Sequence, residues 1–161
     1  MPKDKIPVTP AIRALRQAGV AFTAREYRYE DHGGTQVAAR ELGVYEHVVV
    51  KTLIFQDEAG QPFVVLMHGD MEVSTRNLAR ITGRRAVSPC DQAAAERYTG
   101  YQVGGISPFG VRRAMPVFAE AGILELERLC INGGRRGLLV EMSGADLRRV
   151  LDPTPVRAAR P

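Results

Sequence analysis

The segment from Gly100 to Gly110 constrains this chain more than any other, because it holds four glycines and a proline within eleven residues. Such a composition favours neither a regular helix nor a long central strand. Because the glycines carry no side chain, the N–H groups of this backbone can approach a carbonyl oxygen or a phosphate closely. The segment predicts either a surface turn or a ligand-binding loop, and local sequence leaves both interpretations open.

The length of 161 residues predicts one domain covering 1–161, with residues 1–8 and 153–161 as flexible ends. The chain is 45% hydrophobic and 25% charged, which is typical of a soluble globular protein with its own core. The sequence contains no apolar run long enough to cross a membrane, and its first residues lack an apolar signal core. We therefore expect a cytoplasmic protein without a membrane partner.

Charge and metal-ligating residues narrow the function only slightly. The net charge of +4 comes mainly from arginine, which suits either phosphate recognition or a solvated surface balanced by acids. Cys90 and Cys130 are expected to be reduced thiols in the core rather than nucleophiles or a disulfide. His32, His47 and His68 show no metal-ligand spacing, so no metal site is predicted.

Strand-forming and helix-forming segments intermingle without regular βαβ units. The runs 48–55 and 62–67 flank the turn 57–61 and predict a β-hairpin. Further strands are expected at 22–29, 115–119, 128–131 and 138–142, a glycine-rich turn at 132–137, and helices at 11–18, 35–42, 75–81, 91–98 and 144–151. Because hairpins imply antiparallel pairs, the fold class is predicted as α+β with a mixed sheet.

Lys51 is the most conspicuous charged residue, because it lies inside the most hydrophobic strand. It either sits on an exposed sheet face or offers a cation to a phosphate or oxyanion in a cleft. The sequence lacks a G-x-S-x-G elbow, a Walker loop and a G-x-G-x-x-G fingerprint. Ser107 has no evident base partner and is interpreted as a turn hydroxyl.

Taken together, three segments resemble the YbaK family of bacterial Cys-tRNA(Pro) deacylases, relatives of the prolyl-tRNA synthetase editing domain. The likeness runs from Thr9 to Leu151, and its anchors are residues 50–53, 99–108 and 133–138. The resemblance implies a barrel-like mixed sheet flanked by helices. It also implies a hydrolase without a cofactor that cleaves the ester joining a wrong amino acid to tRNA. Mischarged tRNA is the implied partner, with prolyl-tRNA synthetase as a second one.

The resemblance also assigns site residues. The family's essential lysine falls on Lys51 and the first glycine of its G-x-x-x-P motif on Gly104, which gives both a catalytic role. Substrate-binding roles fall on Tyr27, Thr52, Gly105, Ile106, Ser107, Pro108, Asn132 and Gly133. We expect the Gly104 and Gly105 amides to hold the ester carbonyl or its oxyanion, and the substrate itself to assist hydrolysis.

Three positions depart from the cysteine-specific pattern, namely the loop near Gly34, Asn132 and Leu139. They leave open an alternative deacylase that acts on Ala-, Ser- or Thr-tRNA. A second alternative is a non-catalytic module that binds tRNA or a synthetase, which the arginine pairs and the missing base would fit.

Overall fold

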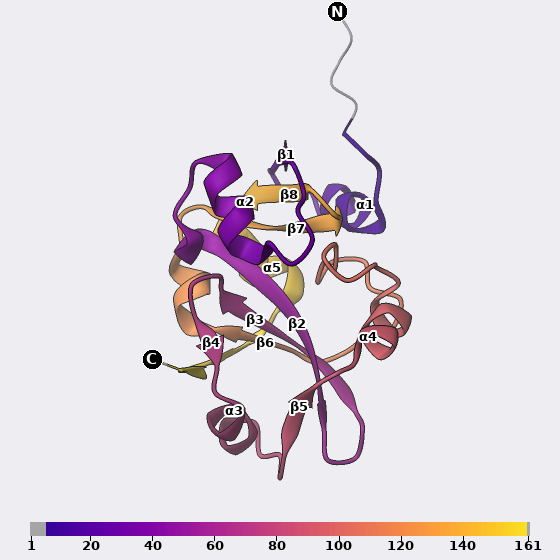
Figure 1. The fold of residues 1–161 in the computed structure, drawn as a ribbon, viewed down its shortest axis with the longest axis vertical. Helices are drawn as coiled ribbons and strands as arrows, with labels where there is room; N and C mark the ends of the chain where they lie inside the picture. The colour runs from indigo at the N-terminus through magenta and orange to yellow at the C-terminus, as the bar shows by residue number, and fades with distance from the viewer. Residues whose placement is uncertain (1–5, 161) are drawn as a thin grey trace, which may run out of the picture.

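A mixed sheet organises residues 6–160, the part of the chain that the computed structural model describes (Figure 1). Its strands are β1 (Thr23–Glu26), β2 (Val49–Asp57), β3 (Pro62–His68), β5 (Val87–Pro89), β6 (Val117–Glu120), β7 (Leu129–Arg135), β8 (Leu138–Met142) and β9 (Thr154–Val156). A separate two-stranded sheet joins β4 (Glu72–Val73) to β10 (Ala159–Arg160).

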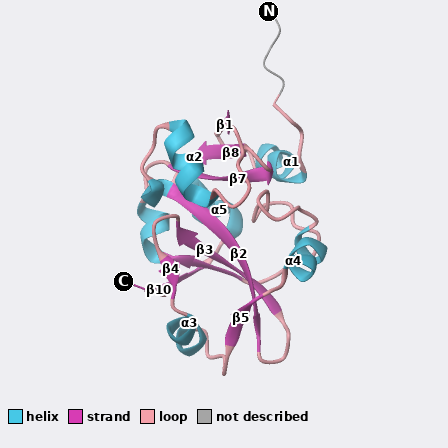
Figure 2. Cartoon of the chain, viewed as in Figure 1, coloured by secondary structure: helices cyan, strands magenta, loops and turns pink. Residues whose placement is uncertain are grey.

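Helices flank this sheet, as Figure 2 shows. They are α1 (Pro10–Gln17), α2 (Gly34–Leu42), α3 (Thr75–Ile81), α4 (Gln92–Thr99) and α5 (Gly144–Leu151), with 3₁₀ turns η1 (Glu46–Val48) and η2 (Ala121–Glu125). The prediction of a mixed sheet flanked by helices is confirmed. No helix among residues 6–160 is long and apolar enough to cross a membrane.

The strand order is β1-β8-β7-β2-β3-β6-β9, and β5 pairs separately with β2. The predicted hairpin is confirmed, since β2 and β3 are antiparallel with Val50 opposite His68 and Gln56 opposite Pro62. Parallel pairs join β2 to β7, β3 to β6 and β6 to β9. These pairs connect strands far apart in sequence, which makes the sheet mixed.

The edge of β2 opposite β3 has two partners and an interruption between them. Val49 and Val50 pair with β7, whereas Phe55 to Asp57 pair with β5. Within the described chain, residues 51–54 have no strand partner on this edge. The interior of the sheet therefore presents an open strand edge, a place where backbone groups can receive a ligand.

Side-chain caps fix the starts of four helices. The side chains of Thr9, Ser74, Asp91 and Ser143 accept hydrogen bonds from the first-turn amides of α1, α3, α4 and α5. Thr35 is a residue type that often caps helices, but it does not cap α2, because the helix begins after Gly33 without a side-chain cap. The Thr35 hydroxyl instead lies 2.7 Å from Oε2 of Glu46, in η1.

The glycine pair Gly133-Gly134 lies inside β7, not in the predicted turn at 132–137. The register between β7 and β8 shifts between Asn132 and Arg135, which marks a β-bulge. Gly134 has φ of 98°, a conformation that glycine adopts without steric cost. The sequence misled here because glycines serve bulges and turns equally well.

Residues 154–156 and 159–160 form strands, which corrects the prediction of a flexible end at 153–161 for these residues, while Pro161 lies outside the described part. β9 pairs with β6 and β10 with β4, and Val156 and Ala158 are buried. They pack into a cluster with Phe63 and Leu78. Of the other predicted flexible end, residues 1–5 lie outside the described residues.

Truncation of Val156 tests this correction. Val156→Ala removes buried methyl groups from the cluster beneath α3, so we expect unfolding to become easier by about 1–2 kcal/mol. Arg157→Ala, at the exposed neighbouring position, should leave stability unchanged. Urea denaturation measures the free energy of unfolding of both variants. A Val156→Ala variant as stable as wild type would mean that the tail does not pack against this cluster.

Candidate functional site

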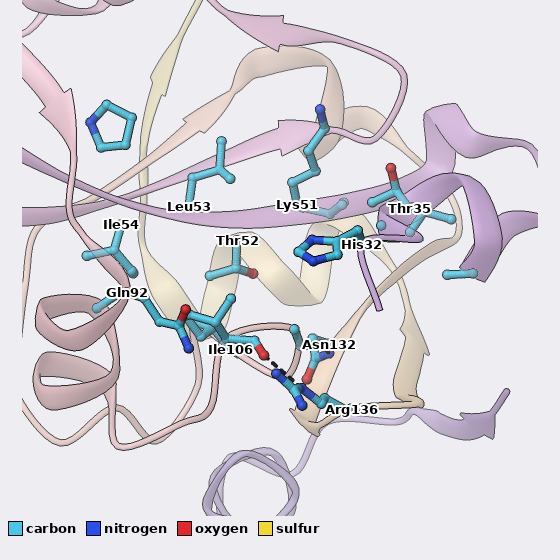
Figure 3. A pocket seen from close by; sticks show the side chains of 18 of the residues that line it. His32, Thr35, Lys51, Thr52, Leu53, Ile54, Gln92, Ile106, Asn132 and Arg136 are labelled. Atoms are coloured by element: carbon cyan, nitrogen blue, oxygen red, sulfur yellow. Dashed lines mark hydrogen bonds between the residues drawn. The ribbon is translucent and has the colours of Figure 1, made fainter. Parts of the chain in front are cut away.

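A cavity of about 670 Å³ lies along the open edge of β2 (Figure 3). Its floor is β2 from Val49 to Phe55. The walls come from the segments after β1, the start of α2, β4, the start of α3, α4, the glycine-rich loop and the bulge of β7. These elements come from most of the chain length, so the cavity exists only in the folded sheet.

The cavity reaches both sides of β2. Lys51 and Leu53 project from one side of the strand, whereas Thr52 and Ile54 project from the other, toward Ile106 (Figure 3). Alternation along a strand requires this arrangement. The site therefore has a Lys51 side and a Thr52 side, joined through the interruption in strand pairing.

Backbone polar groups of Thr52 face the open edge. The Ile54 carbonyl accepts a hydrogen bond from the Cys90 amide at 2.9 Å, which shows that Ile54 directs its backbone groups away from β3. In an antiparallel pair, the backbone groups of successive residues point alternately toward and away from the partner strand. Thr52 lies two residues before Ile54, so its N–H and C=O also point away from β3. The Thr52 hydroxyl is also buried without a hydrogen-bond partner among the described residues. An unpaired donor and acceptor therefore border the cavity.

Lys51 places a cation on its side of the strand. Its Nζ lies 3.3 Å from Oε1 of Glu72, whose side chain is 70% exposed, while that of Lys51 is 19% exposed. An ion pair with so exposed a carboxylate contributes little, so an anionic ligand can replace Glu72. In Figure 3 the ammonium points away from Ile106 and Arg136.

The glycine-rich loop is held in shape by its own side chains. The Tyr101 hydroxyl donates to the Phe109 carbonyl, and burial raises the pKa of Tyr101 to about 12, which keeps this donor protonated. The Ser107 hydroxyl accepts from the Phe109 amide at 3.2 Å. The carboxylate of Glu96 accepts from the Val103 amide at 2.8 Å.

Asn132 and Arg136 tie this loop to the bulge of β7. The Asn132 side chain donates to the Gly104 carbonyl at 3.2 Å and accepts from the Gly134 amide at 2.6 Å. Arg136 donates through Nε to the Val103 carbonyl at 2.9 Å. Its guanidinium also lies 5.1 Å from the centre of the Tyr29 ring. Two glycine-rich segments thus form one wall.

The two adjacent glycines of this wall have different surroundings. A Cβ on Gly104 would meet the Tyr29 hydroxyl at 2.6 Å, whereas a Cβ on Gly105 would meet the backbone nitrogen of Arg136 at 2.7 Å. The Gly105 amide already donates to the Gln102 carbonyl at 2.8 Å. It cannot serve as the expected donor to the substrate unless that bond breaks. The amides of Gly104 and Ile106 donate to no backbone acceptor in residues 6–160.

The structure brings most of the predicted site residues to one cavity. Its lining includes Tyr27, Lys51, Thr52, Gly104, Ile106 and Asn132. Four other predicted site residues are buried and do not line the cavity, namely Gly105, Ser107, Pro108 and Gly133. Gly34 and Leu139, the positions of departure, also line the cavity. The roles of all these residues in substrate binding remain predictions.

Sequence reasoning missed several lining residues, among them Tyr29, Asp31, His32, Glu72 and Arg136. His32 is exposed at the rim with φ of 61°, a left-handed conformation that often marks a functional loop. Arg136 could have been predicted from the sequence, because it lies two residues after the second glycine pair. Nothing in the sequence indicated that His32 lines the same cavity as Lys51.

The remaining chemistry of the lining is limited. Cys90 lines the cavity, and burial raises the pKa of its thiol, which disfavours the nucleophilic thiolate. Residues 6–160 hold no group of three or more His, Cys, Asp or Glu side chains able to bind a metal ion. Besides backbone donors, Lys51 and Arg136, the site offers the polar side chains of His32 and Asn132 beside an apolar lining.

Comparison with known proteins identifies the family. The chain belongs to the aminoacyl-tRNA editing domain family, whose sequence model matches residues 30–150. An Enterococcus faecalis protein named "Putative Cys-tRNA(Pro)/Cys-tRNA(Cys) deacylase EbsC" is 27% identical over 136 residues, which cover 84% of this chain and 83% of that protein. A proline--tRNA ligase of Nitratidesulfovibrio vulgaris is 32% identical over 105 residues, which cover 65% of this chain and 17% of the ligase.

Solved structures share the fold. One described as "a putative trans-editing enzyme for prolyl tRNA synthetase" superposes with a TM-score of 0.83 at 19% identity, covering 96% of this chain and all of that one (100%). A hypothetical protein superposes with a TM-score of 0.86 at 23% identity, over 94% of this chain and 100% of the other. At such identities the likeness concerns the fold alone.

The contact between the two glycine-rich segments can be tested at Gly105. Gly105→Ala places a methyl group against the Arg136 backbone, so we expect it to reduce the free energy of unfolding by about 1–3 kcal/mol. Gly104→Ala should also cost about 1–2 kcal/mol, because Gly104 has φ of 94°, where an added Cβ is strained even if the Tyr29 side chain moves. Thermal unfolding compares the two variants. A Gly105→Ala variant as stable as wild type would contradict the contact.

Proposed function

We propose that this chain is a trans-acting editing hydrolase that deacylates mischarged tRNA, with Cys-tRNA(Pro) as its substrate. The observation that carries the proposal is the cavity at the open edge of β2, with Lys51 on one side and the Gly104 amide among its walls. Its volume of about 670 Å³ suits a terminal nucleoside with its amino acid. Membership of the editing family and the resemblance to EbsC support this assignment.

In the proposed complex, the aminoacyl ester lies on the Thr52 side and the 3′-terminal phosphate on the Lys51 side. The Gly104 and Ile106 amides donate to the ester oxygen as it gains negative charge, and one such donor is typically worth about 3 kcal/mol. Lys51 exchanges its exposed partner Glu72 for the phosphate. Asn132 fixes the Gly104 peptide through its carbonyl, which positions the neighbouring amides.

The substrate supplies the nucleophile. The cysteine thiolate attacks its own ester carbonyl, the bond to the ribose oxygen breaks, and that oxygen leaves as a hydroxyl after taking a proton. Water then opens the resulting thiolactone to free cysteine. A thiol is suited to this step because a few per cent of it is ionised near neutral pH, and confinement in the cavity brings it close to the carbonyl.

A second candidate substrate is Ala-tRNA(Pro). The observation that favours it is Leu139, which is 4% exposed and lines the cavity near Ala38 and Val49. This apolar lining accepts a methyl side chain as readily as a thiol, since pockets discriminate poorly between side chains of similar size. Alanine has no thiol, so its hydrolysis would require attack by water.

Single-turnover deacylation of tRNA(Pro) carrying cysteine, alanine, serine or threonine tests the proposal. We expect cysteine to be released fastest. Lys51→Ala should lower kcat/KM about tenfold to a hundredfold, the usual effect of losing a charge-assisted hydrogen bond. Absence of hydrolysis with all four substrates would refute the hydrolase assignment and favour a tRNA-binding or synthetase-binding module.

His32→Asn separates substrate assistance from general-base catalysis. Asparagine tolerates the left-handed backbone at this position but cannot accept a proton near neutral pH. If the thiol is the nucleophile, the variant should release cysteine at the wild-type rate. A loss of a hundredfold or more, the lower range for removing a general base, would assign that role to His32 instead.

A further inference from the structure

A second hollow of about 440 Å³ adjoins the cavity and is lined by arginines. Arg76 and Arg80 come from α3, while Arg84 and Arg85 come from the segment that leads into β5. Thr75 lines both the hollow and the cavity, so the two lie on either side of the start of α3. We call these four arginines the α3 cluster.

One member of the α3 cluster has a structural role. Nε of Arg84 lies 3.7 Å from Oδ2 of Asp57, and its guanidinium lies 4.4 Å from the centre of the Phe63 ring. Arg84 is therefore neutralised and packed against the core. It fixes the segment that carries Arg85 and should not be altered in a test of binding.

The other three arginines are free to bind. Arg76, Arg80 and Arg85 are exposed, and none has a carboxylate within 4.0 Å in residues 6–160. The carboxylate of Glu58 is nearby, but it accepts hydrogen bonds from the Arg85 and Ala86 backbone amides. The hollow thus keeps an excess of positive charge after Asp57 and Glu58 are considered.

The α3 cluster is connected to the Lys51 side of β2 through β4. Lys51 contacts Glu72, which belongs to β4, and β4 is followed directly by Ser74 and the first turn of α3. In Figure 1, β4 leads into α3 at the end of the molecule where β5 also lies. The α3 cluster therefore follows closely in the chain after Glu72, the residue that contacts Lys51.

We propose that the α3 cluster binds the phosphodiester backbone of the tRNA acceptor end while the terminal residue occupies the cavity. This inference rests on the proposed function, since it takes tRNA as the ligand. Guanidinium groups pair with phosphate in a bidentate manner and are more weakly hydrated than ammonium groups. Such backbone contacts position a nucleic acid without reading its sequence. Recognition of a particular amino acid then belongs to the cavity alone.

The binding test uses an uncharged tRNA(Pro) transcript. The triple variant Arg76→Ala, Arg80→Ala, Arg85→Ala should raise Kd about tenfold or more and reduce the slope of log K against log salt by about two to three. The matched control replaces three other exposed arginines, Arg16, Arg128 and Arg148, which line neither cavity nor hollow. It loses the same charge and should bind tRNA within about twofold of wild type.

Hydrolysis of cysteinyl adenosine, an ester without a phosphodiester, separates this inference from the proposed function. The triple variant should cleave it at the wild-type rate while kcat/KM for Cys-tRNA(Pro) falls about tenfold. If wild type cleaves neither ester, the proposed function fails. The comparison of tRNA binding among the variants still shows whether the α3 cluster binds RNA. Equal tRNA binding by the triple variant and wild type, or an equal loss in the control, would overturn the assignment.

Discussion

The interruption in pairing along β2 is the constraint on which the site depends. β2 uses one edge continuously for β3 but divides the other between β7 and β5, so residues 51–54 have no strand partner there among residues 6–160. Buried backbone groups need partners. A strand edge left open in the middle of a sheet is thus a place where a ligand can supply them. Because side chains alternate along a strand, those of residues 51–54 project from both sides of β2.

The wall opposite this edge is held together by close backbone contact and by hydrogen bonds between its two segments. Glycines allow two backbone segments to approach more closely than any side chain would permit, and Asn132 and Arg136 then join them by hydrogen bonds. Catalytic amides must be fixed in advance to stabilise a developing charge. The glycines therefore serve the packing of the wall as much as access for a ligand, and Gly105 and Gly133 belong to the packing.

Elements whose signals lie close together in the chain were predictable, whereas features that depend on distant partners were not. The hairpin β2–β3 and the caps at Thr9, Ser74, Asp91 and Ser143 depend on neighbours in sequence and were predictable. The tail strands β9 and β10 pair with segments more than thirty residues away, and at three and two residues they are too short to carry a strand pattern. Lys51 and the loop around Gly104 stood out in the sequence, and their proposed roles came from the family resemblance, whereas the hydrogen bond between Arg136 and the loop depends on the fold.

Binding of a stable substrate mimic to the open edge tests the account most directly. An adenosine carrying cysteine through an amide in place of the ester can be titrated into ¹⁵N-labelled protein and followed by amide chemical shifts. We expect the largest changes at the amides of Thr52, Gly104 and Ile106. Saturable binding that leaves these three amides unmoved and shifts another surface would contradict it.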